Sequence, residues 1–397
     1  MGPPSDRNII IMVEPQCAAF EHAQFNAALL RTVRLAYPSS KIVFYGEKAH
    51  LGYVRDELAR IHGADRVDFR IMGIPNRKSS RWRRLPLEFS LCCRILAGIS
   101  RTDISALIFC SVTNINLLSL KILMRIKRFH LPTVAIVHGA LAGIARRSLS
   151  PWSWIMGFKR VLALPHPRNL RLIVLGDSIL SNVKKMLPRH ISQWQSLDLG
   201  YLWPSQGSEA LCHPLPIDSP VCFGFLGISS KGFDVFCQLA QDIAPRPGNA
   251  AFIMVGFYNG PAQKKPICRY VPQIPDKPLS RKEFEDRLNR LSYVVWTAEP
   301  DHYRLSASAT FLDALAFLKP GIYQRNDYIE YYFDRMGDIG YLCDSYEEMV
   351  AVIKAIILEF PIIRYQRQIE NIRKGRIMFE PGTLAPRLRA IVDDCVA

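Results

Sequence analysis

The stretch Cys222-Phe-Gly-Phe-Leu-Gly-Ile-Ser-Ser-Lys-Gly-Phe-Asp-Val-Phe-Cys-Gln-Leu-Ala240 carries the signals that decide the fold. Its first residues are apolar and predict a short buried strand. A turn of small residues with one lysine follows, made of Gly227, Ser229, Ser230, Lys231 and Gly232. Apolar residues then recur at helical spacing, at Phe233, Phe236, Leu239 and Ala240. The stretch therefore predicts a strand, a tight turn and an amphipathic helix.

A turn of this kind is suited to a phosphate. Backbone N–H groups at a helix N-terminus point outward, and the helix dipole favours a negative charge there. Lys231 adds a positive charge to the same turn. An ordinary connection between a strand and a helix has the same local pattern, so both interpretations stay open at this point.

The alternation of strand and helix extends in both directions from this stretch. In the first half, apolar runs that are typical of buried parallel strands lie at 8–13, 41–45, 67–72, 105–110, 133–137 and 170–175. After a proline-rich segment the alternation restarts, with strands predicted at 222–226, 251–256, 268–271, 293–297 and 320–324. This order favours an α/β protein with two doubly wound, Rossmann-like parallel sheets.

The length of 397 residues also favours two domains over one. We expect a first domain at 1–204, a linker at 205–220 and a second domain at 221–375, followed by a helical segment at 376–397. Ligands of open α/β sheets bind at the carboxyl ends of the strands. The residues at those strand ends are therefore the candidates for function.

Composition limits the possible partners and the cell compartment. A net charge of +16, from 51 Lys and Arg against 35 Asp and Glu, favours an anionic partner such as a membrane surface, a nucleic acid or a phosphorylated substrate. Ten scattered cysteines without a Cys-x-x-Cys pair indicate buried, reduced thiols in a cytosolic protein. The polar start does not predict a signal peptide, and no apolar run is long enough for a spanning helix.

A second candidate for anion binding lies in Ala298-Glu-Pro-Asp-His-Tyr-Arg-Leu-Ser-Ala-Ser-Ala-Thr-Phe-Leu-Asp-Ala-Leu-Ala-Phe-Leu-Lys-Pro320. A polar loop that contains Tyr303 and Arg304 leads into a helix whose start is small, at Ser306, Ser308 and Thr310. Small residues let an anionic ligand approach the exposed N–H groups closely. A serine-capped helix packed against a neighbour would show the same pattern, so this alternative also stays open.

The order of these motifs resembles that of glycosyltransferases with the GT-B architecture, in which a nucleotide sugar binds between two Rossmann-like domains. Phe225 to Phe233 is similar to the family's phosphate loop, and Ser306 to Pro320 is similar to the small-residue helix of the large retaining, family 4-like group. Where that group has a spaced pair of glutamates, this chain has Leu305 and Asp313, and Ile228 stands in place of the loop arginine. The chain resembles a divergent member.

The resemblance implies roles for particular residues. The donor and nucleotide would contact Gly227, Ser229, Ser230, Lys231, Gly232, Tyr303, Arg304, Ser306, Ser308 and Thr310. Asp313 would take the place of a catalytic carboxylate, and His138 would lie against the donor sugar. A packing role for His138 stays open. The resemblance also implies that the final helix returns to the first domain and that no metal or other cofactor is bound.

Polar residues at the first strand of the first domain supply candidates for a catalytic base. Glu14 follows this strand and His22 is expected on the next helix, so either could act toward an acceptor hydroxyl, which would matter most if the reaction inverts configuration. A solvated helix face is an alternative for His22. The histidines show no metal-ligand spacing.

A basic segment in the first domain suggests where the acceptor binds. Its cations and one aromatic residue are Arg77, Lys78, Arg81, Trp82, Arg83 and Arg84, and leucines follow. Basic residues mixed with Trp and Leu suit an anionic membrane interface better than a nucleic acid, which is not expected as a partner. A merely solvated face of a basic protein stays possible.

The sequence thus predicts a cytoplasmic glycosyltransferase, peripheral on the inner face of the cell membrane. It would move a sugar from a nucleotide-diphosphate donor to a lipid-linked or glycan acceptor in the synthesis of a surface polysaccharide or glycolipid. Two alternatives stay open: a sugar-nucleotide epimerase or hydrolase on the same fold, and a basic protein that binds a membrane or a nucleic acid without catalysis.

Overall fold

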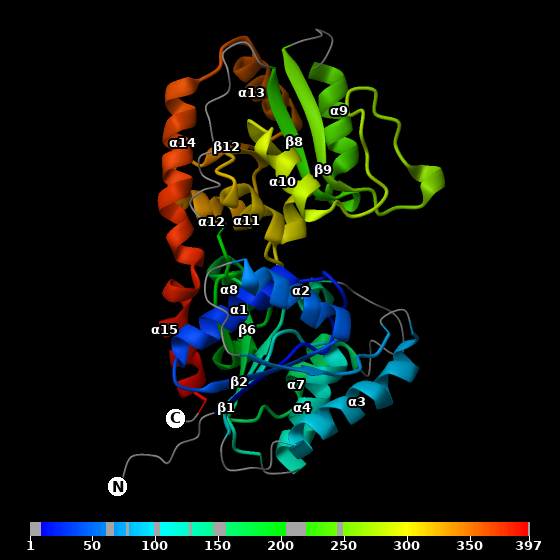
Figure 1. Ribbon diagram of the computed structural model, residues 1–397, viewed down its shortest axis with the longest axis vertical. Helices are drawn as coiled ribbons and strands as arrows, with labels where there is room; N and C mark the ends of the chain where they lie inside the picture. Colours follow the sequence, from blue (N-terminus) through cyan, green and yellow to red (C-terminus); the bar gives the residue numbers. More distant parts are fainter. Residues whose placement is uncertain are drawn as a thin grey trace. The chain divides into compact units, whose positions relative to one another are not determined.

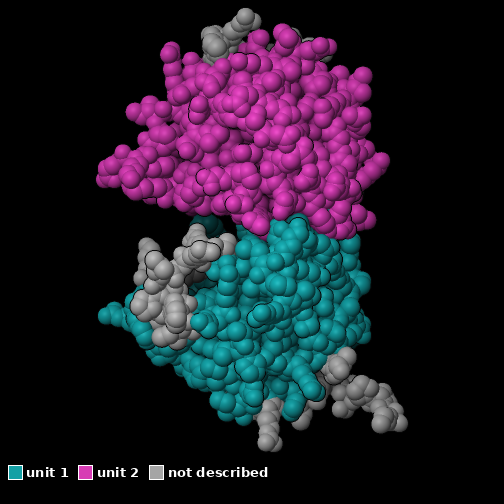
Figure 2. Space-filling model, turned by 180° about the vertical axis from the view of Figure 1, so that it is seen from behind, with its two compact units in different colours: residues 1–202, 305–307, 378–397 teal, residues 203–304, 308–377 magenta. Residues whose placement is uncertain are grey.

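The computed structural model describes residues 9–60, 67–76, 79–98, 104–126, 129–145, 156–203, 220–243 and 249–395. The chain forms two compact units (Figure 2). Unit 1 comprises Met1–Leu202, Leu305–Ala307 and Met378–Ala397, and unit 2 comprises Trp203–Arg304 and Ser308–Ile377. Apart from Pro220, the expected linker 205–220 lies outside the described residues. The expected domain boundaries stay predictions.

Unit 1 is built on a sheet of parallel strands in the order β3-β2-β1-β4-β5-β6-β7. The strands are β1 (Ile9–Val13), β2 (Lys41–Gly46), β3 (Val67–Ile71), β4 (Ile104–Phe109), β5 (Thr133–Ile136), β6 (Leu170–Val174) and β7 (Trp194–Ser196). Side chains of β1, β4 and β5 are buried almost throughout, as expected for strands that are covered on both faces. The strand order reverses between β1 and β4.

Helices cover both faces of this sheet, because right-handed crossovers place the two halves of such a sheet on opposite sides. The helices are α1 (Ala23–Ala36), α2 (Lys48–Ala59), α3 (Arg81–Gly98), α4 (Asn114–Ile126), α5 (Ala142–Ala145), α7 (Phe158–Ala163), α8 (Asp177–Met186) and α15 (Pro381–Asp393). Helix α1 packs against α2 and α15, whereas α4 packs against α3 and α7 (Figure 1). The C-terminal helix α15 therefore completes unit 1, as predicted.

Unit 2 contains a smaller parallel sheet in the order β12-β11-β10-β8-β9. The strands are β8 (Val221–Ile228), β9 (Ala250–Phe257), β10 (Tyr293–Trp296), β11 (Gly321–Gln324) and β12 (Gly340–Cys343). Its helices are α9 (Phe233–Ile243), α10 (Arg281–Asn289), α11 (Ala309–Ala316), α12 (Asp327–Met336), α13 (Tyr346–Leu358) and α14 (Ile362–Gly375). Two doubly wound α/β units confirm the predicted fold class.

Aromatic side chains fix the first strand and helix of unit 2 to each other. Phe225 of β8 meets Phe233 of α9 with ring centroids 5.2 Å apart, and Phe236 lies 5.8 Å from Phe252 of β9. All four side chains are at most 3% exposed. Burial of one such side chain contributes about 1.5–3 kcal/mol. This cluster confirms the apolar helix face that was predicted at 233–240, and it holds the turn between β8 and α9 in place.

The prediction of a strand at 268–271 is wrong, because these residues lie in an irregular segment between β9 and α10. Prolines at 266, 272, 275 and 278 remove N–H donors that a sheet needs. Cys268 and Val271 are buried without a strand, so their apolar pattern reflects packing against the core of unit 2. The sequence also did not reveal the short strands β7 and β12.

Leu318 ends helix α11 in the left-handed conformation, with φ 52°. Glycine is the residue that adopts this conformation most readily at a helix C-terminus. Leu318 is only 1% exposed. The left-handed conformation costs a leucine about 1–2 kcal/mol. The loss of a buried leucine side chain costs about 2–5 kcal/mol. Packing therefore outweighs backbone strain at this position.

We expect Leu318→Gly to lower the free energy of unfolding by about 1–3 kcal/mol, since the lost packing exceeds the strain that is relieved. Leu318→Ala removes most of the same side chain but keeps the strain, so it should be less stable than Leu318→Gly by about 1 kcal/mol. Urea titrations of both variants measure these differences. Equal stability of the two variants would contradict the strain.

Candidate functional sites at the strand ends

The strand order of unit 2 reverses between β8 and β10, and this point is where open α/β sheets bind ligands. Two glycines with positive φ shape the backbone here, Gly227 at 102° and Gly232 at 92°. A Cβ atom on Gly232 would lie 2.2 Å from the carbonyl oxygen of Thr297, which follows β10. The hydroxyl of Thr297 donates a 2.6 Å hydrogen bond to the Gly232 carbonyl. The turn is thus pressed against the end of β10.

The two serines of the turn hydrogen-bond with Asn259, which follows β9. The Ser229 hydroxyl donates to Asn259 Oδ1 at 2.9 Å, and the Ser230 N–H donates to the same oxygen at 3.1 Å. The Gly232 N–H donates to the Ser229 carbonyl. These groups therefore shape the turn, and the first N–H groups of α9 remain for a ligand. Sequence reasoning missed Asn259, although an Asn-Gly pair after a strand is a turn signal.

Lys231 is half-buried at the end of this turn. Its Nζ lies 5.5 Å from the ring centroid of Tyr303, which is a cation–π contact. Within the described part of the chain, no carboxylate or carbonyl oxygen binds this ammonium group. Burial lowers the pKa of Lys231, because the charged form loses hydration. A cation without an anionic partner is what a site for an external anion requires.

The start of α11 meets the same turn. A Cβ on Gly227 would lie 3.1 Å from Thr310 Cγ2. The hydroxyls of Ser308 and Thr310 are 3.0 Å apart, and both hydrogen-bond with the buried Tyr303 hydroxyl. Burial raises the pKa of Tyr303, and these hydrogen bonds offset only part of that rise. A cavity of about 10 Å³, roughly the size of one water, is lined by Lys231, Tyr303 and Thr310 together with strand residues. The structure thus brings Gly227, Lys231, Tyr303, Ser308 and Thr310 together.

Three other residues predicted for the donor site are Arg304, Ser306 and Asp313. Arg304 is exposed and forms an ion pair with Asp301 at 3.7 Å. Asp313 is buried within α11, at 8% exposure. Ser306 belongs by its contacts to unit 1. The donor-site roles of these three residues stay predictions.

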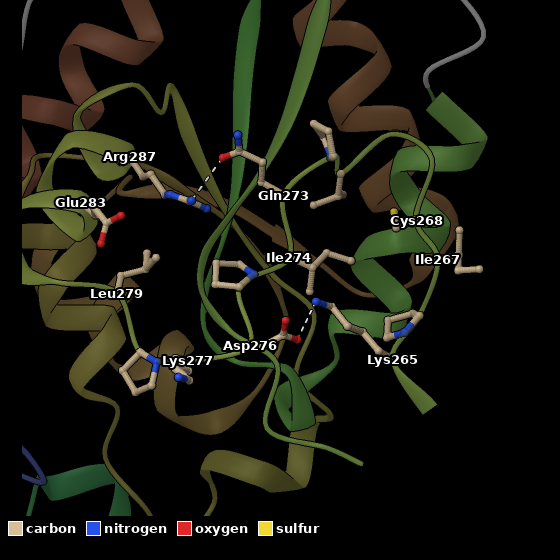
Figure 3. A pocket seen from close by; sticks show the side chains of 15 residues that line it. Lys265, Ile267, Cys268, Gln273, Ile274, Asp276, Lys277, Leu279, Glu283 and Arg287 are labelled. Carbon is tan, nitrogen blue, oxygen red and sulfur yellow. Dashed lines mark hydrogen bonds and ion pairs between the residues drawn. The ribbon is translucent and has the colours of Figure 1, made fainter. Parts of the chain in front are cut away.

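A wide hollow of about 990 Å³ opens in unit 2 along the segment 265–279 and α10 (Figure 3). Four prolines and Ile267, Ile274 and Leu279 form much of its wall. Two of its cations are already paired, Lys265 with Asp276 at 2.6 Å and Arg287 with Gln273 at 3.2 Å. Lys277 also lines the hollow, and Asp276 and Glu283 add negative charges, so both signs of charge are present there.

In unit 1 the strand order reverses between β1 and β4, and Glu14 lies at this point. Its carboxylate is fully buried and accepts hydrogen bonds from the Gln16 and Cys17 N–H groups at 3.0 and 3.1 Å and from Asn26 Nδ2 at 3.1 Å. The Ser111 hydroxyl after β4 is a fourth donor. Burial raises the pKa of Glu14, but the donated hydrogen bonds outweigh it and hold the pKa below its usual value.

His22 and His138 lie beside each other in unit 1. Their ring centroids are 4.6 Å apart at an angle of 35°. His22 is exposed and His138, which closes β5, is half-buried. The His22 ring is therefore open to a substrate in a way that the Glu14 carboxylate is not, whereas Nε2 of His138 is buried. The structure brings together the three catalytic candidates of the first domain, although their roles stay predictions.

The basic segment before and within α3 is described only in part. Arg77 and Lys78 lie outside the described residues, as does the side chain of Arg81. Trp82 is 67% exposed and Arg83 is exposed too. Arg84 is not available to a partner in the same way, because it forms a 2.6 Å ion pair with the buried Glu88.

Metal-binding groups and membrane-spanning helices are both absent from the described residues. Among them, no three His, Cys, Asp or Glu side chains form a group that could hold a metal ion. No helix in the described ranges has the length and apolar character needed to cross a bilayer. The cysteines within the described ranges are free thiols.

Solved structures resemble this chain over nearly its whole length. HepE from Anabaena, solved with UDP, matches with a TM-score of 0.63 over 97% of this chain and 99% of that protein, at 12% sequence identity. The chain has the GT-B fold.

Further solved GT-B structures give the same result. A glycosyltransferase from Rickettsia africae matches with a TM-score of 0.65 at 11% identity, over 98% of both chains. The trehalose-phosphate synthase of Burkholderia vietnamiensis matches with 0.65 at 10% identity, over 98% of this chain and 97% of that one. No protein-family profile and no curated protein sequence matches. At these identities the likeness establishes the GT-B fold and nothing finer.

We expect Lys231→Met to raise the free energy of unfolding by about 1 kcal/mol at neutral pH, because methionine fills similar space without a partly desolvated charge. The pKa of Lys231 is lower in the folded than in the unfolded chain, so its charge opposes folding below the folded pKa. This destabilisation disappears as the pH rises through the pKa that Lys231 has in the unfolded chain. The gain should therefore shrink in alkaline buffer. Denaturant titrations at neutral and alkaline pH measure it, and a loss of stability at neutral pH would contradict the prediction.

Proposed function

We propose that this protein is a glycosyltransferase that moves a sugar from a nucleotide-diphosphate donor to a hydroxyl of a lipid-linked or glycan acceptor. The observation that carries the proposal is Lys231, a half-buried cation without an anionic partner among the described residues, at the point of strand reversal in unit 2. The GT-B fold supports it, as do the solved structures of HepE with UDP and with UDP-glucose.

The donor diphosphate would bind at the turn between β8 and α9. The Lys231 ammonium would contact the phosphate oxygens, and the first N–H groups of α9 would add further donors. The glycosidic C–O bond breaks with its electron pair going to the diphosphate, so negative charge grows on the leaving group. Fixed donors at that position stabilise the charge in the transition state.

Hydroxyl groups at the start of α11 would complete the donor side. Tyr303, Ser308 and Thr310 hydrogen-bond with one another, and each of them is held by packing or by a further bond, such as that of the Ser308 N–H to the Tyr328 hydroxyl at 3.2 Å. A fixed hydroxyl can rotate its proton toward an incoming phosphate. No metal is needed to supply positive charge in this arrangement, and we propose a metal-independent reaction.

Unit 1 would supply the acceptor side. We propose that His22 or His138 takes the proton of the acceptor hydroxyl if configuration inverts. If configuration is retained, the leaving phosphate helps to take that proton and His138 contacts the donor sugar. The exposure of the His22 ring supports this assignment for His22, since a base must reach the proton that it removes. Asp313 stays a candidate for stabilising the sugar cation.

A membrane-bound acceptor is the finer part of the proposal. Trp82 and Leu87 are 67% and 53% exposed on α3, and Arg83 is exposed between them. Exposed aromatic and aliphatic side chains beside a cation suit the interface of an anionic bilayer. This surface would hold the protein, as a peripheral protein, on the cytoplasmic face of a membrane where a lipid-linked acceptor lies.

Binding of nucleotides tests the donor site. We expect Lys231→Met to weaken the affinity for UDP by about 10- to 100-fold, since a hydrogen bond to a charged group contributes about 1.5–3 kcal/mol. Isothermal titration calorimetry over a panel of nucleoside diphosphates measures this. Lys282→Met, at an exposed site on α10, is the matched control and should bind as the wild type does. Unchanged affinity in Lys231→Met would refute the proposed site.

The same site predicts a pH dependence. Burial lowers the pKa of Lys231, so the ammonium loses its proton at a lower pH than an exposed lysine does. We expect the affinity for UDP to fall as the pH rises into the alkaline range, and the Lys231→Met variant to lose this dependence. An equal alkaline fall in both proteins would assign the effect to another group.

Turnover separates the proposed function from its alternatives. We expect release of a nucleoside diphosphate from one member of a nucleotide-sugar panel, and we expect a membrane-lipid extract to increase the rate. Release without any acceptor dependence would favour a hydrolase, and a changed donor sugar on chromatography would favour an epimerase. Binding without turnover under all these conditions would favour a non-catalytic role.

A further inference from the structure

The segment between β1 and α1 holds an unfavourable backbone conformation. Ala19 and His22 both adopt left-handed φ angles, 49° and 53°. Each such residue costs about 1–2 kcal/mol when it is not glycine. A loop with two of them keeps its shape only where the surrounding structure over-determines it. The contacts around residues 15–22 should therefore show what holds this loop.

The Glu14 carboxylate holds the beginning of the loop. Its Oε1 accepts the N–H groups of Gln16 and Cys17, so the chain is bound immediately after the strand. The same oxygen accepts the Ser111 hydroxyl, which ties the loop to the end of β4. Hydrogen bonds to a buried, ionised carboxylate are stronger than those between neutral groups.

A second connection leads from Glu14 to Ala19. Asn26 Nδ2 donates to Glu14 Oε2 at 3.1 Å and lies 2.8 Å from His50 Nε2. His50 Nδ1 lies 2.9 Å from the Ala19 carbonyl oxygen. Since a carbonyl only accepts, Nδ1 carries the ring proton, and Nε2 is then free to accept the second proton of the Asn26 amide. Glu14, Asn26 and His50 therefore form one directed chain of hydrogen bonds that ends on a strained residue.

We propose that Glu14 is a positioning residue that holds the loop 15–22, with its left-handed Ala19 and His22, and thereby sets the His22 ring against His138. A contribution of Glu14 to catalysis rests on the proposed function, but the role of Glu14 in holding the loop does not. The carboxylate is 0% exposed, so an acceptor hydroxyl cannot reach it to give up a proton, and its four donors all come from the protein itself. The histidine that it positions is exposed.

Hydrogen exchange tests the loop without any substrate. Glu14→Gln keeps the shape of the side chain but turns one acceptor oxygen into a donor that faces other donors. We expect the amides of 16–23 to exchange about 10- to 100-fold faster, and chymotrypsin to cleave after Phe20, which is 53% exposed, more readily. His50→Phe, which removes the far end of the same chain, should have the same effect and serves as the second variant if Glu14→Gln does not fold.

A matched variant distinguishes positioning from loss of stability. Val161→Ala removes buried volume from α7, which packs against α4 and α5. At equal loss of global stability it should leave exchange at 16–23 unchanged. Unchanged loop exchange in both Glu14→Gln and His50→Phe would overturn the proposal.

Kinetics test the consequence for catalysis. If the wild type turns over, Glu14→Gln and His50→Phe should both lower kcat by about 10-fold or more and leave the affinity for UDP unchanged. A base role for Glu14 predicts a different result: Glu14→Gln would abolish turnover with unchanged loop exchange, whereas His50→Phe would remain active. If the wild type shows no turnover, the proposed function fails, and the exchange result still decides whether Glu14 holds the loop.

Discussion

The close approach of Gly232 to the carbonyl oxygen of Thr297 is the constraint on which unit 2 depends. No side chain fits between these two backbone segments, and the hydroxyl of Thr297 adds a hydrogen bond to the Gly232 carbonyl. The turn after β8 is thereby fixed to the end of β10. Lys231 stands beside Gly232, so its position follows from the same contact, as does its distance from the Tyr303 ring.

Unit 1 reaches a similar result with different chemistry. Where unit 2 has glycines that allow backbones to touch, unit 1 has a buried carboxylate that gathers N–H and O–H groups around the end of β1. Both arrangements lie at the point where the strand order of the sheet reverses. In each unit the loop after the first strand is therefore held rigidly, whatever side chains it presents to a ligand.

The sequence predicted what depends on local pattern. The strand, turn and helix at 222–240 and the burial of Phe233 and Phe236 are confirmed, because apolar periodicity reports directly on packing. The strand predicted at 268–271 is wrong, since the same apolar pattern satisfies a buried irregular segment when prolines remove the ladder donors. Partners far apart in sequence, such as Asn259 with Ser229 and Asn26 with His50, leave no periodic signal. The conformations of Ala19 and Leu318 could not be predicted either, because alanine and leucine rarely adopt positive φ, and a histidine such as His22 does so in only a minority of cases.

The partial burial of Lys231 has a consequence for how an anion would bind there. The surroundings remove part of the hydration of this ammonium group while the chain folds, before any anion arrives. An incoming phosphate would displace less water from the cation than it would from an exposed lysine. Part of the dehydration of this cation thus takes place during folding and not during association.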